Sequence, residues 1–350
     1  MIRVLVVEDS KTVQQALVSI LNSDPEITVV GTASDGAEAV RAAMNLRPDL
    51  ITMDINMPEM DGFEATRAIM SVAPTPIVVV TSQLDPKDSA TLFRVMEAGA
   101  LMVLAKPAPP GHPDREETVA KLIRNIKLMS EIKVVRRIQR GGAETRIPPA
   151  PPIAEPIRPG LIAIGASAGG PPVLEEILSA LPADLAVPIL IVQHMAEGFT
   201  VNFVNWLNHS SRLPVHLAVH GARPLPGTVY VAPDGQHLGV GAGERIILSP
   251  TPPDNGLRPS VAHLFRSVAA VYGKRAVGVL LTGMGRDGAE ELRLIRDGGG
   301  VTVAQDQQTS VVFGMPGEAI RLKAASYVLP PPAIVALLTK LAAPQGGGNG

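Results

Sequence analysis

The sequence predicts an α/β protein with two doubly wound parallel-sheet domains joined by a proline-rich linker. Three observations support this fold class. Short, near-continuous apolar runs alternate with helical patterns in both halves of the chain, which is typical of parallel strands covered by helices on both faces. Six of the fourteen residues 147–160 are proline, which favours extended backbone over a folded core. A length of 350 residues suits two to three domains at about 150 residues each.

The expected strands follow from the apolar runs. In the first domain we expect strands at 2–7, 27–31, 50–54, 76–81 and 101–105. In the second we expect them at 161–166, 189–193, 276–282, 301–304 and 326–329. Two further runs, 228–233 and 244–249, are separated by Gly and Asp and predict a small antiparallel excursion. The domain bounds are then 1–125 for the first domain, 126–158 for the linker, 159–343 for the second domain and 344–350 for a disordered tail.

Composition excludes several classes of protein. The net charge of −2 and the ten aromatic residues argue against nucleic-acid binding, which needs basic charge or stacking aromatics. The absence of cysteine removes disulfides, thiolate metal sites and cysteine nucleophiles. The longest apolar runs reach about eight residues, so we expect no membrane insertion, and the first residues lack a signal peptide. We therefore expect a cytoplasmic protein.

Polar side chains follow several strands of the first domain. Glu8 and Asp9 follow the first strand and Asp54 ends the third, and one such carboxylate alone would commonly be a solvated loop residue. The carboxyl ends of parallel strands meet at one edge of a sheet, so these carboxylates form a site suited to Mg²⁺. Thr81 and Lys106 end or follow the fourth and fifth strands. Asp54 is then the phosphorylated nucleophile, and Thr81 and Lys106 contact the phosphoryl oxygens.

The segments VLVVEDS, DLITMDINMPEMDGFEA, VVVTS and LAKP resemble the motifs of two-component response-regulator receiver domains. The resemblance covers residues 1 to about 125. It implies a flavodoxin-like domain that a histidine kinase phosphorylates on Asp54. One departure is Val103, because the family often carries an aromatic residue there that takes part in signal transmission.

The second domain contains a candidate nucleophile. The strand 161–166 runs directly into Ser167, and the segment Gly165-Ala166-Ser167-Ala168-Gly169 fits the nucleophile-elbow pattern G-x-S-x-G. That pattern alone also fits a serine that caps the following helix or a phosphate-binding turn. The segment does not fit G-x-G-x-x-G, so dinucleotide binding has less support than these alternatives.

Candidates for a base and an acid are the polar residues that follow other apolar strands, as Ser167 follows 161–166. Of the seven histidines, only His194 directly follows a strongly apolar strand, and no H-E-x-x-H pair supports a zinc hydrolase. Asp287 follows a glycine-rich turn after 276–282, with Asp297 and Asp306 as weaker competitors. If these residues form a Ser-His-Asp catalytic triad, Ser167 attacks a carbonyl, His194 takes the serine proton and Asp287 orients the imidazole.

Backbone amides complete the expected site. Those of Ala168 and Met284 would form the oxyanion hole, where one donor contributes about 3–4 kcal/mol of transition-state stabilisation. The esterase chemistry requires no cofactor. Arg258 and Met315 are further candidates for the substrate side, although a structural role in its loop fits Met315 equally well.

The segments IGASAGG, IVQHM, GFT, VYVAP, LRPSVAHLFRSVA, LLTGMGRDGAEEL and AQD…VVFGMP resemble the catalytic domain of the chemotaxis protein-glutamate methylesterases, the CheB family. The order of receiver, linker and this Rossmann-like domain also reproduces that family's architecture. The resemblance implies phosphorylation-activated hydrolysis of glutamate methyl esters on methyl-accepting chemotaxis receptors, with deamidation of receptor glutamines and association with receptor arrays. It places the triad on the same Ser167, His194 and Asp287.

Three alternatives remain open. The same hydrolase could serve a chemosensory pathway that controls something other than motility, or the chain could be a catalytically silent response regulator that docks to the array. A DNA-binding response regulator is disfavoured, because the region after the linker shows α/β alternation and no basic recognition helix.

Overall fold

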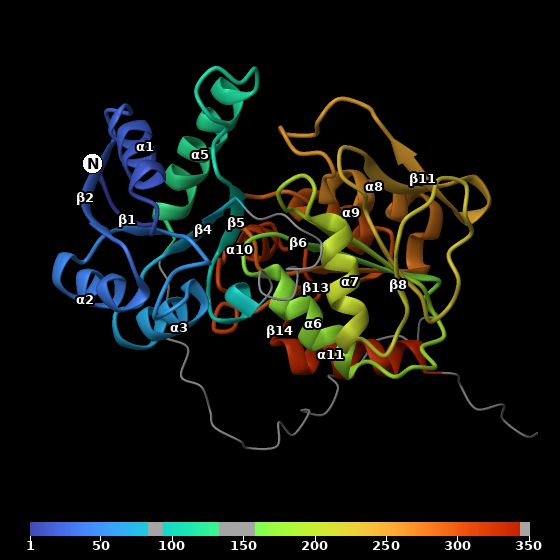
Figure 1. Ribbon diagram of the computed structural model, residues 1–350. Coiled ribbons are helices and arrows are strands. Elements are labelled where there is room, and N and C mark those ends of the chain that lie inside the picture. The colour runs from blue at the N-terminus through green and yellow to red at the C-terminus, as the bar shows by residue number, and fades with distance from the viewer. Residues whose placement is uncertain (83–93, 133–157, 344–350) are drawn as a thin grey trace, which may run out of the picture. The chain divides into compact units, whose positions relative to one another are not determined.

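The structure is a computed structural model that describes residues 1–82, 94–132 and 158–343. The chain divides into two compact units, Met1–Gly141 and Gly142–Gly350, which are described separately (Figure 1). Both are α/β units with parallel sheets, so the predicted fold class is confirmed. Most of the expected linker and the whole expected tail 344–350 lie outside the described residues.

The first unit contains a five-stranded parallel sheet in the order β2-β1-β3-β4-β5. Its strands are β1 (Ile2–Val7), β2 (Ile27–Ala33), β3 (Leu50–Met53), β4 (Ile77–Thr81) and β5 (Met102–Ala105). Strand order reverses between β1 and β3, which creates a crevice at their carboxyl ends. The residues after β1 and β3 therefore meet there.

Helices cover both faces of this sheet, with α2 and α3 on one side and α1 and α5 on the other (Figure 1). The bounds of these helices are α1 (Lys11–Asn22), α2 (Gly36–Leu46), α3 (Gly62–Val72) and α5 (Arg115–Ser130). Asp35 and Asp61 cap α2 and α3 by accepting a backbone N–H three residues ahead, as short acidic side chains do at helix starts. Helix α5 runs to Ser130, past the expected start of the linker at 126.

The second unit contains a seven-stranded parallel sheet in the order β14-β13-β12-β6-β7-β9-β8. Its strands are β6 (Leu161–Ala166), β7 (Ile189–Gln193), β8 (Val215–Leu217), β9 (Val229–Val231), β12 (Ala276–Leu280), β13 (Val301–Gln305) and β14 (Tyr327–Leu329). Strands β7, β8 and β9 are added on one side of β6. The chain then crosses to the other side of β6, where β12, β13 and β14 are added in turn. The switch point lies between β6 and β12, where ligands bind in open α/β sheets.

One expectation about strands is wrong. The segment 228–233 contains β9, which pairs in parallel with both β7 and β8 inside the main sheet. The antiparallel pair is instead β10 (His237–Gly241) with β11 (Arg245–Ser249). The sequence His-Leu-Gly-Val-Gly of β10 is a weak strand signal, because its two glycines lower strand propensity.

Helices also cover both faces of the second sheet. Their bounds are α6 (Gly170–Ala180), α7 (Thr200–Ser210), α8 (Val261–Tyr272), α9 (Ala289–Asp297), α10 (Met315–Arg321) and α11 (Pro331–Ala342). Helix α6 packs against α7 and α11, whereas α9 packs against α8 and α10, and β10 lies on α8. Phe203 and Phe265 are the largest fully buried side chains of the core. Within the described ranges, no helix is both long and apolar enough to cross a membrane.

Candidate functional site

Three expected site residues lie beyond the ends of neighbouring strands in the second unit. The β6–β7 register pairs Ala166 with Gln193, so Ser167 and His194 leave adjacent strands at the same level. The backbone N–H of His194 donates to the Ala166 carbonyl at 3.0 Å, and that of Ser167 donates to the Thr282 carbonyl beyond β12 at 3.0 Å. The sheet therefore holds the Ser167 backbone at the switch point, between the chain segments that carry the other two residues.

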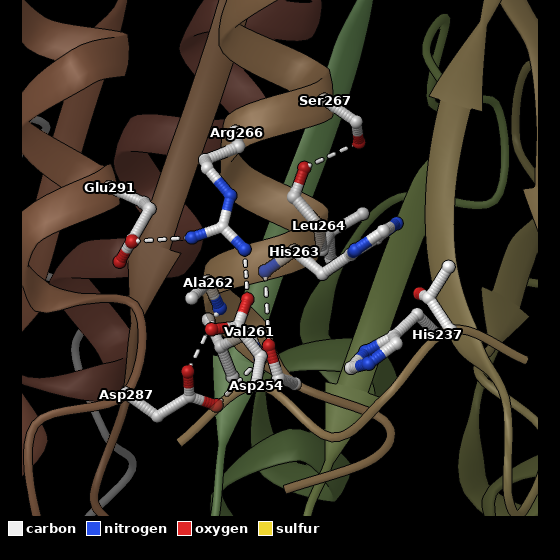
Figure 2. Close-up of polar contacts among 12 residues, drawn as sticks. His237, Asp254, Val261, Ala262, His263, Leu264, Arg266, Ser267, Asp287 and Glu291 are labelled. Carbon is white, nitrogen blue, oxygen red and sulfur yellow. Dashed lines mark hydrogen bonds and ion pairs between the residues drawn. The ribbon is translucent and has the colours of Figure 1, made fainter. Parts of the chain in front are cut away.

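The expected base and acid are in contact. His194 Nε2 lies 2.9 Å from Asp287 Oδ2, and the two side chains are 12% and 3% exposed. Asp287 also accepts the backbone N–H of Val261 at 2.7 Å and of Ala262 at 3.0 Å, in the first turn of α8 (Figure 2). The helix N-terminus favours a negative charge at this position. The acid is thus fixed by a helix that begins far from it in sequence.

The environment of Asp287 keeps its carboxyl ionised. Burial alone would raise its pKa. The hydrogen bond and charge of His194, together with the amides of Val261 and Ala262, outweigh burial and hold the pKa below its ordinary value of 3.8. A buried carboxylate that is charged at neutral pH can fix the tautomer of an imidazole and stabilise its protonated form.

Glycine and proline set the backbone of the turn after Ser167. Gly169 has φ +74°, and the helix that follows begins Gly170-Pro171-Pro172, so its prolines offer no N–H groups. The Gly170 N–H donates to the Ser167 carbonyl at 2.8 Å. Among the described residues, the amide of Ala168 has no acceptor.

The glycine-rich turn after β12 supports the serine. A β-carbon built at Gly283 would lie 2.7 Å from Ser167 Cβ and 2.3 Å from Met315 Sδ. The Gly283 carbonyl accepts the N–H of Met315 at 2.9 Å. Within the same described ranges, the amide of the next residue, Met284, donates to no acceptor. Both amides expected in the oxyanion hole are therefore unengaged.

The two further substrate-side candidates differ in exposure. Met315 is fully buried beside Gly283, so it is not available to a substrate, whereas Arg258 is exposed. Arg258 donates to the carbonyls of Pro250 and Thr251 and so ties its own loop together.

Sequence reasoning missed three buried polar side chains around the serine. They are Gln193 at the end of β7, Thr282 just beyond β12 and Gln305 at the end of β13. Each follows an apolar strand, which is the signal that identified His194. The two glutamine side chains cannot transfer a proton or attack a carbonyl, and the Thr282 hydroxyl is engaged with the backbone, so none of the three is a candidate for the chemical step.

The first unit brings together its expected residues at the β1–β3 switch point. Carboxylate oxygens of Glu8, Asp9 and Asp54 lie within 4.8 Å of one another. Lys106 Nζ lies 2.7 Å from Glu8 Oε2 and 2.7 Å from Asp54 Oδ2. Thr81 ends β4 and its carbonyl accepts the Lys106 N–H at 2.9 Å. All five expected residues therefore lie at this edge of the sheet.

The charges at this edge fit a divalent cation. Burial raises the pKa of Glu8, against the hydrogen bond from Lys106. Burial lowers the pKa of Lys106, but hydrogen bonds to Asp54 and Glu8 outweigh this effect and raise it above 10.5. One ammonium thus faces three carboxyl groups, and two of them, Glu8 and Asp54, are nearly inaccessible to water. Hard oxygen ligands with excess negative charge suit Mg²⁺.

Comparisons with known proteins agree with the division into two domains. The family model for the response regulator receiver domain matches residues 4–112, and that for CheB methylesterase matches residues 162–338. The chain is 54% identical to a protein-glutamate methylesterase/protein-glutamine glutaminase of Nitrosospira multiformis, over 99% of this chain and 98% of the relative. A second relative of that description, from Syntrophus aciditrophicus, is also 54% identical, over 98% of this chain and 99% of the relative.

A solved structure supports the fold of the second unit. The Thermotoga maritima CheB methylesterase catalytic domain matches with a TM-score of 0.51 and 37% identity, and the match covers 53% of this chain and all of that one. The fold and the two family matches together define a receiver domain followed by a Rossmann-like methylesterase domain. The chain belongs to the CheB family of protein-glutamate methylesterase/protein-glutamine glutaminases, and it is a carboxylic ester hydrolase with deamidase activity.

Proposed function

We propose that this hydrolase removes methyl groups from glutamate methyl esters of methyl-accepting chemotaxis receptors with a Ser167-His194-Asp287 triad. The observation that carries the proposal is the 2.9 Å contact between His194 Nε2 and the buried, ionised Asp287 beside the Ser167 turn. With Nε2 protonated toward Asp287, the other ring nitrogen, Nδ1, is the one that accepts the serine proton.

The reaction then follows the usual order of acyl transfer. Ser167 Oγ attacks the ester carbonyl while His194 takes its proton, and His194 returns that proton to the departing methoxide as methanol. Water next attacks the acyl-enzyme with His194 as base and releases the glutamate. A glutamine side chain reacts in the same way with ammonia as the leaving group. The free amides of Ala168 and Met284 would stabilise the tetrahedral oxyanion in both steps.

We also propose that phosphorylation of Asp54 by a histidine kinase activates the hydrolase. Glu8, Asp9 and Asp54 would hold Mg²⁺, which neutralises charge on the incoming phosphoryl group. Lys106 already contacts Asp54 Oδ2, and it would move with the Thr81 hydroxyl to contact the phosphoryl oxygens. We expect the substrate to be a receptor in an array, of either a motility pathway or another chemosensory pathway.

Methanol release from methylated receptor membranes tests the enzymatic proposal. Ser167→Ala should lower the rate by about 10⁴-fold or more, because the nucleophile is lost. Ser179→Ala is the matched control, since Ser179 Oγ donates to a carbonyl of its own helix, that of Glu176. Near-wild-type turnover by Ser167→Ala would overturn the triad. A wild-type protein that binds the membranes but releases no methanol would favour the silent docking alternative.

A further inference from the structure

Two of the buried polar side chains beyond the triad hold the carbonyls of the Ser167 turn. Gln193 is 5% exposed at the end of β7, and Thr282 is fully buried just after β12. Because β7 and β12 are the two neighbours of β6, these side chains approach the turn from opposite sides of the strand that carries Ser167. Neither is needed to complete a proton relay.

Gln193 connects the nucleophile to the base through the backbone. Its Nε2 donates to the Ser167 carbonyl at 2.9 Å and to the His194 carbonyl at 2.8 Å. Carbonyls only accept, so the side-chain amide can have only this orientation. Its Oε1 consequently points at Gly170, where a β-carbon would lie 2.2 Å from it, and in the described part of the chain this oxygen has no donor. A buried acceptor without a partner is costly, and such exceptions call for an explanation.

Thr282 holds the next carbonyl. Its Oγ1 lies 3.0 Å from the Ala168 carbonyl and 3.2 Å from that of Val312, and it accepts the Val312 N–H at 2.9 Å. The backbone N–H of Thr282 donates to Gln305 Oε1 at 2.8 Å, so its position is itself fixed by a buried side chain. The turn is thus clamped at two successive carbonyls.

Clamping a carbonyl also sets the direction of an amide. In a planar trans peptide the C=O and the N–H point in opposite directions. Gln193 and Gly170 hold the Ser167 carbonyl, so the N–H of Ala168 must point away from Gln193. Thr282 holds the same turn from the other side, through the Ala168 carbonyl. Within the described ranges, the Ala168 amide donates to no protein acceptor.

We infer that Gln193 and Thr282 are positioning residues that hold the Ser167 turn from both sides and so aim the backbone amide of Ala168 at the oxyanion formed on substrate attacked by Ser167. The inference rests on the proposed triad function and adds the device that preorganises its oxyanion hole. Gly170 belongs to the same device, because only a residue without a β-carbon leaves room for Gln193 Oε1.

The test uses the full-length protein with methylated receptor membranes and a fluorophosphonate probe. That probe bonds its phosphorus to Ser167 Oγ as fluoride leaves and His194 takes the proton, with the phosphoryl oxygen in the oxyanion hole. Gln193→Met keeps side-chain length and burial but removes both donors. We expect kcat and the probe-labelling rate constant each to fall about 100-fold with little change in KM, since oxyanion donors act on the transition state.

Controls separate positioning from general destabilisation. Asn208→Leu removes a side-chain amide that likewise donates to two backbone carbonyls, those of Val204 at 3.1 Å and Val215 at 2.7 Å, away from Ser167. We expect it to lower thermal stability without changing the labelling rate constant of the folded protein. Thr282→Val should lower kcat, and Thr282→Ser, which keeps the hydroxyl, should restore most of it.

The outcomes are distinct. A folded Gln193→Met protein with wild-type kcat and labelling rate constant overturns the inference while the triad stands. If Gln193→Met does not fold, the Thr282 pair decides, and equal rates for Thr282→Val and Thr282→Ser overturn it. If Ser167→Ala keeps its activity, the proposed function itself fails, and the inference fails with it.

Discussion

Gly283 lies so close to Ser167 that a β-carbon at position 283 would be 2.7 Å from Ser167 Cβ. Real β-carbons are essentially never that close to another carbon. On its other side the same β-carbon would meet the sulfur of the fully buried Met315. The turn after β12 therefore approaches the nucleophile at a distance that only glycine permits, and the position of Ser167 depends on the absence of a side chain there.

Gly283→Ala should displace Ser167 and lower kcat strongly. Overpacking of a buried site costs typically about 1–3 kcal/mol of folding stability, so a stability loss should accompany the loss of rate. The matched control is Gly278→Ala on β12, whose β-carbon would meet Leu292 Cδ1 at 2.7 Å and Ile295 Cδ1 at 2.9 Å, away from the serine. Chemical unfolding and methanol release measure both effects. Equal specific activities for the two folded variants would contradict the role given to Gly283.

Asp287→Asn should remove most activity although the side chain keeps its size. Loss of the matching acid from a serine triad costs about 10⁴-fold in kcat, because the imidazole is no longer held in the required tautomer. The new NH₂ group would also face either the Val261 or the Ala262 amide, and an unpaired buried donor costs about 1–3 kcal/mol of stability. Asp297→Asn, on the exposed end of α9, serves as the control for kinetics and urea unfolding. Retention of full activity by Asp287→Asn would exclude it as the triad acid.

The parts of the site visible in the sequence are those where an apolar strand ends in a reactive side chain. Ser167 and His194 are of this kind, because the edge of a parallel sheet gathers strand ends without further information. The clamp of Asp287 by Val261 and Ala262 was not predictable, since backbone N–H groups leave no residue signature.

The predicted strand pairing is least accurate where strands are short. The segment containing β9 has only three strand residues, Val229–Val231, and its composition suits an antiparallel or a parallel neighbour equally well. Its place between β7 and β8 is decided by tertiary packing. The burial of Met315 beside Gly283 is likewise decided by tertiary packing. The sequence therefore could not show that this side chain is unavailable to a substrate.

Folding stability should fall as the pH drops through about 6.5, because of a stacked histidine pair in the second unit. The rings of His237 and His263 stack with centroids 4.6 Å apart, beside the first turn of α8 (Figure 2). His237 Nε2 donates to the Pro252 carbonyl at 3.2 Å. Burial, and then the charge of His237, lower the pKa of His263 below its ordinary value of 6.5.

The folded protein therefore binds fewer protons at this position than the unfolded chain does. Stability is fully present above the unfolded pKa and declines as the pH falls below it toward the folded pKa. Urea unfolding between about pH 8 and about pH 5.5 measures the decline, around the ordinary histidine pKa. His263→Phe keeps an aromatic ring in the stack and should flatten the profile, whereas His209→Asn, at an exposed position, should not. An unchanged profile in His263→Phe would exclude this pair as the cause.

Asp54→Asn should abolish Mg²⁺-dependent phosphorylation by a small phosphodonor. The nucleophilic oxygen is lost, although Glu8 and Asp9 still offer metal ligands. Asp35→Asn is the control, because Asp35 caps α2 through its bond from the Glu38 N–H and asparagine caps equally well. Incorporation of radiolabel from the phosphodonor is the measurement. If label entered Asp54→Asn at the wild-type rate, another residue would be the acceptor.

The last prediction concerns the effect of the receiver on the hydrolase. Phosphorylation adds about two negative charges at Asp54, and these can draw Lys106 and Thr81 toward the phosphoryl group. Shifting an inhibited state from 99% to 1% of molecules requires about 5.5 kcal/mol of differential stabilisation. A few charge-assisted contacts can supply less, and at Val103 a small, 7% exposed side chain stands in place of an aromatic switch residue. We therefore expect graded activation of the full-length protein.

A fragment of residues 158–343, which contains every strand of the second sheet, should exceed the unphosphorylated full-length protein in methanol release. Its rate should not change when a phosphodonor is added. If that fragment folds and is no faster than the resting full-length enzyme, the receiver does not inhibit, and phosphorylation must act on the hydrolase by promoting activity directly.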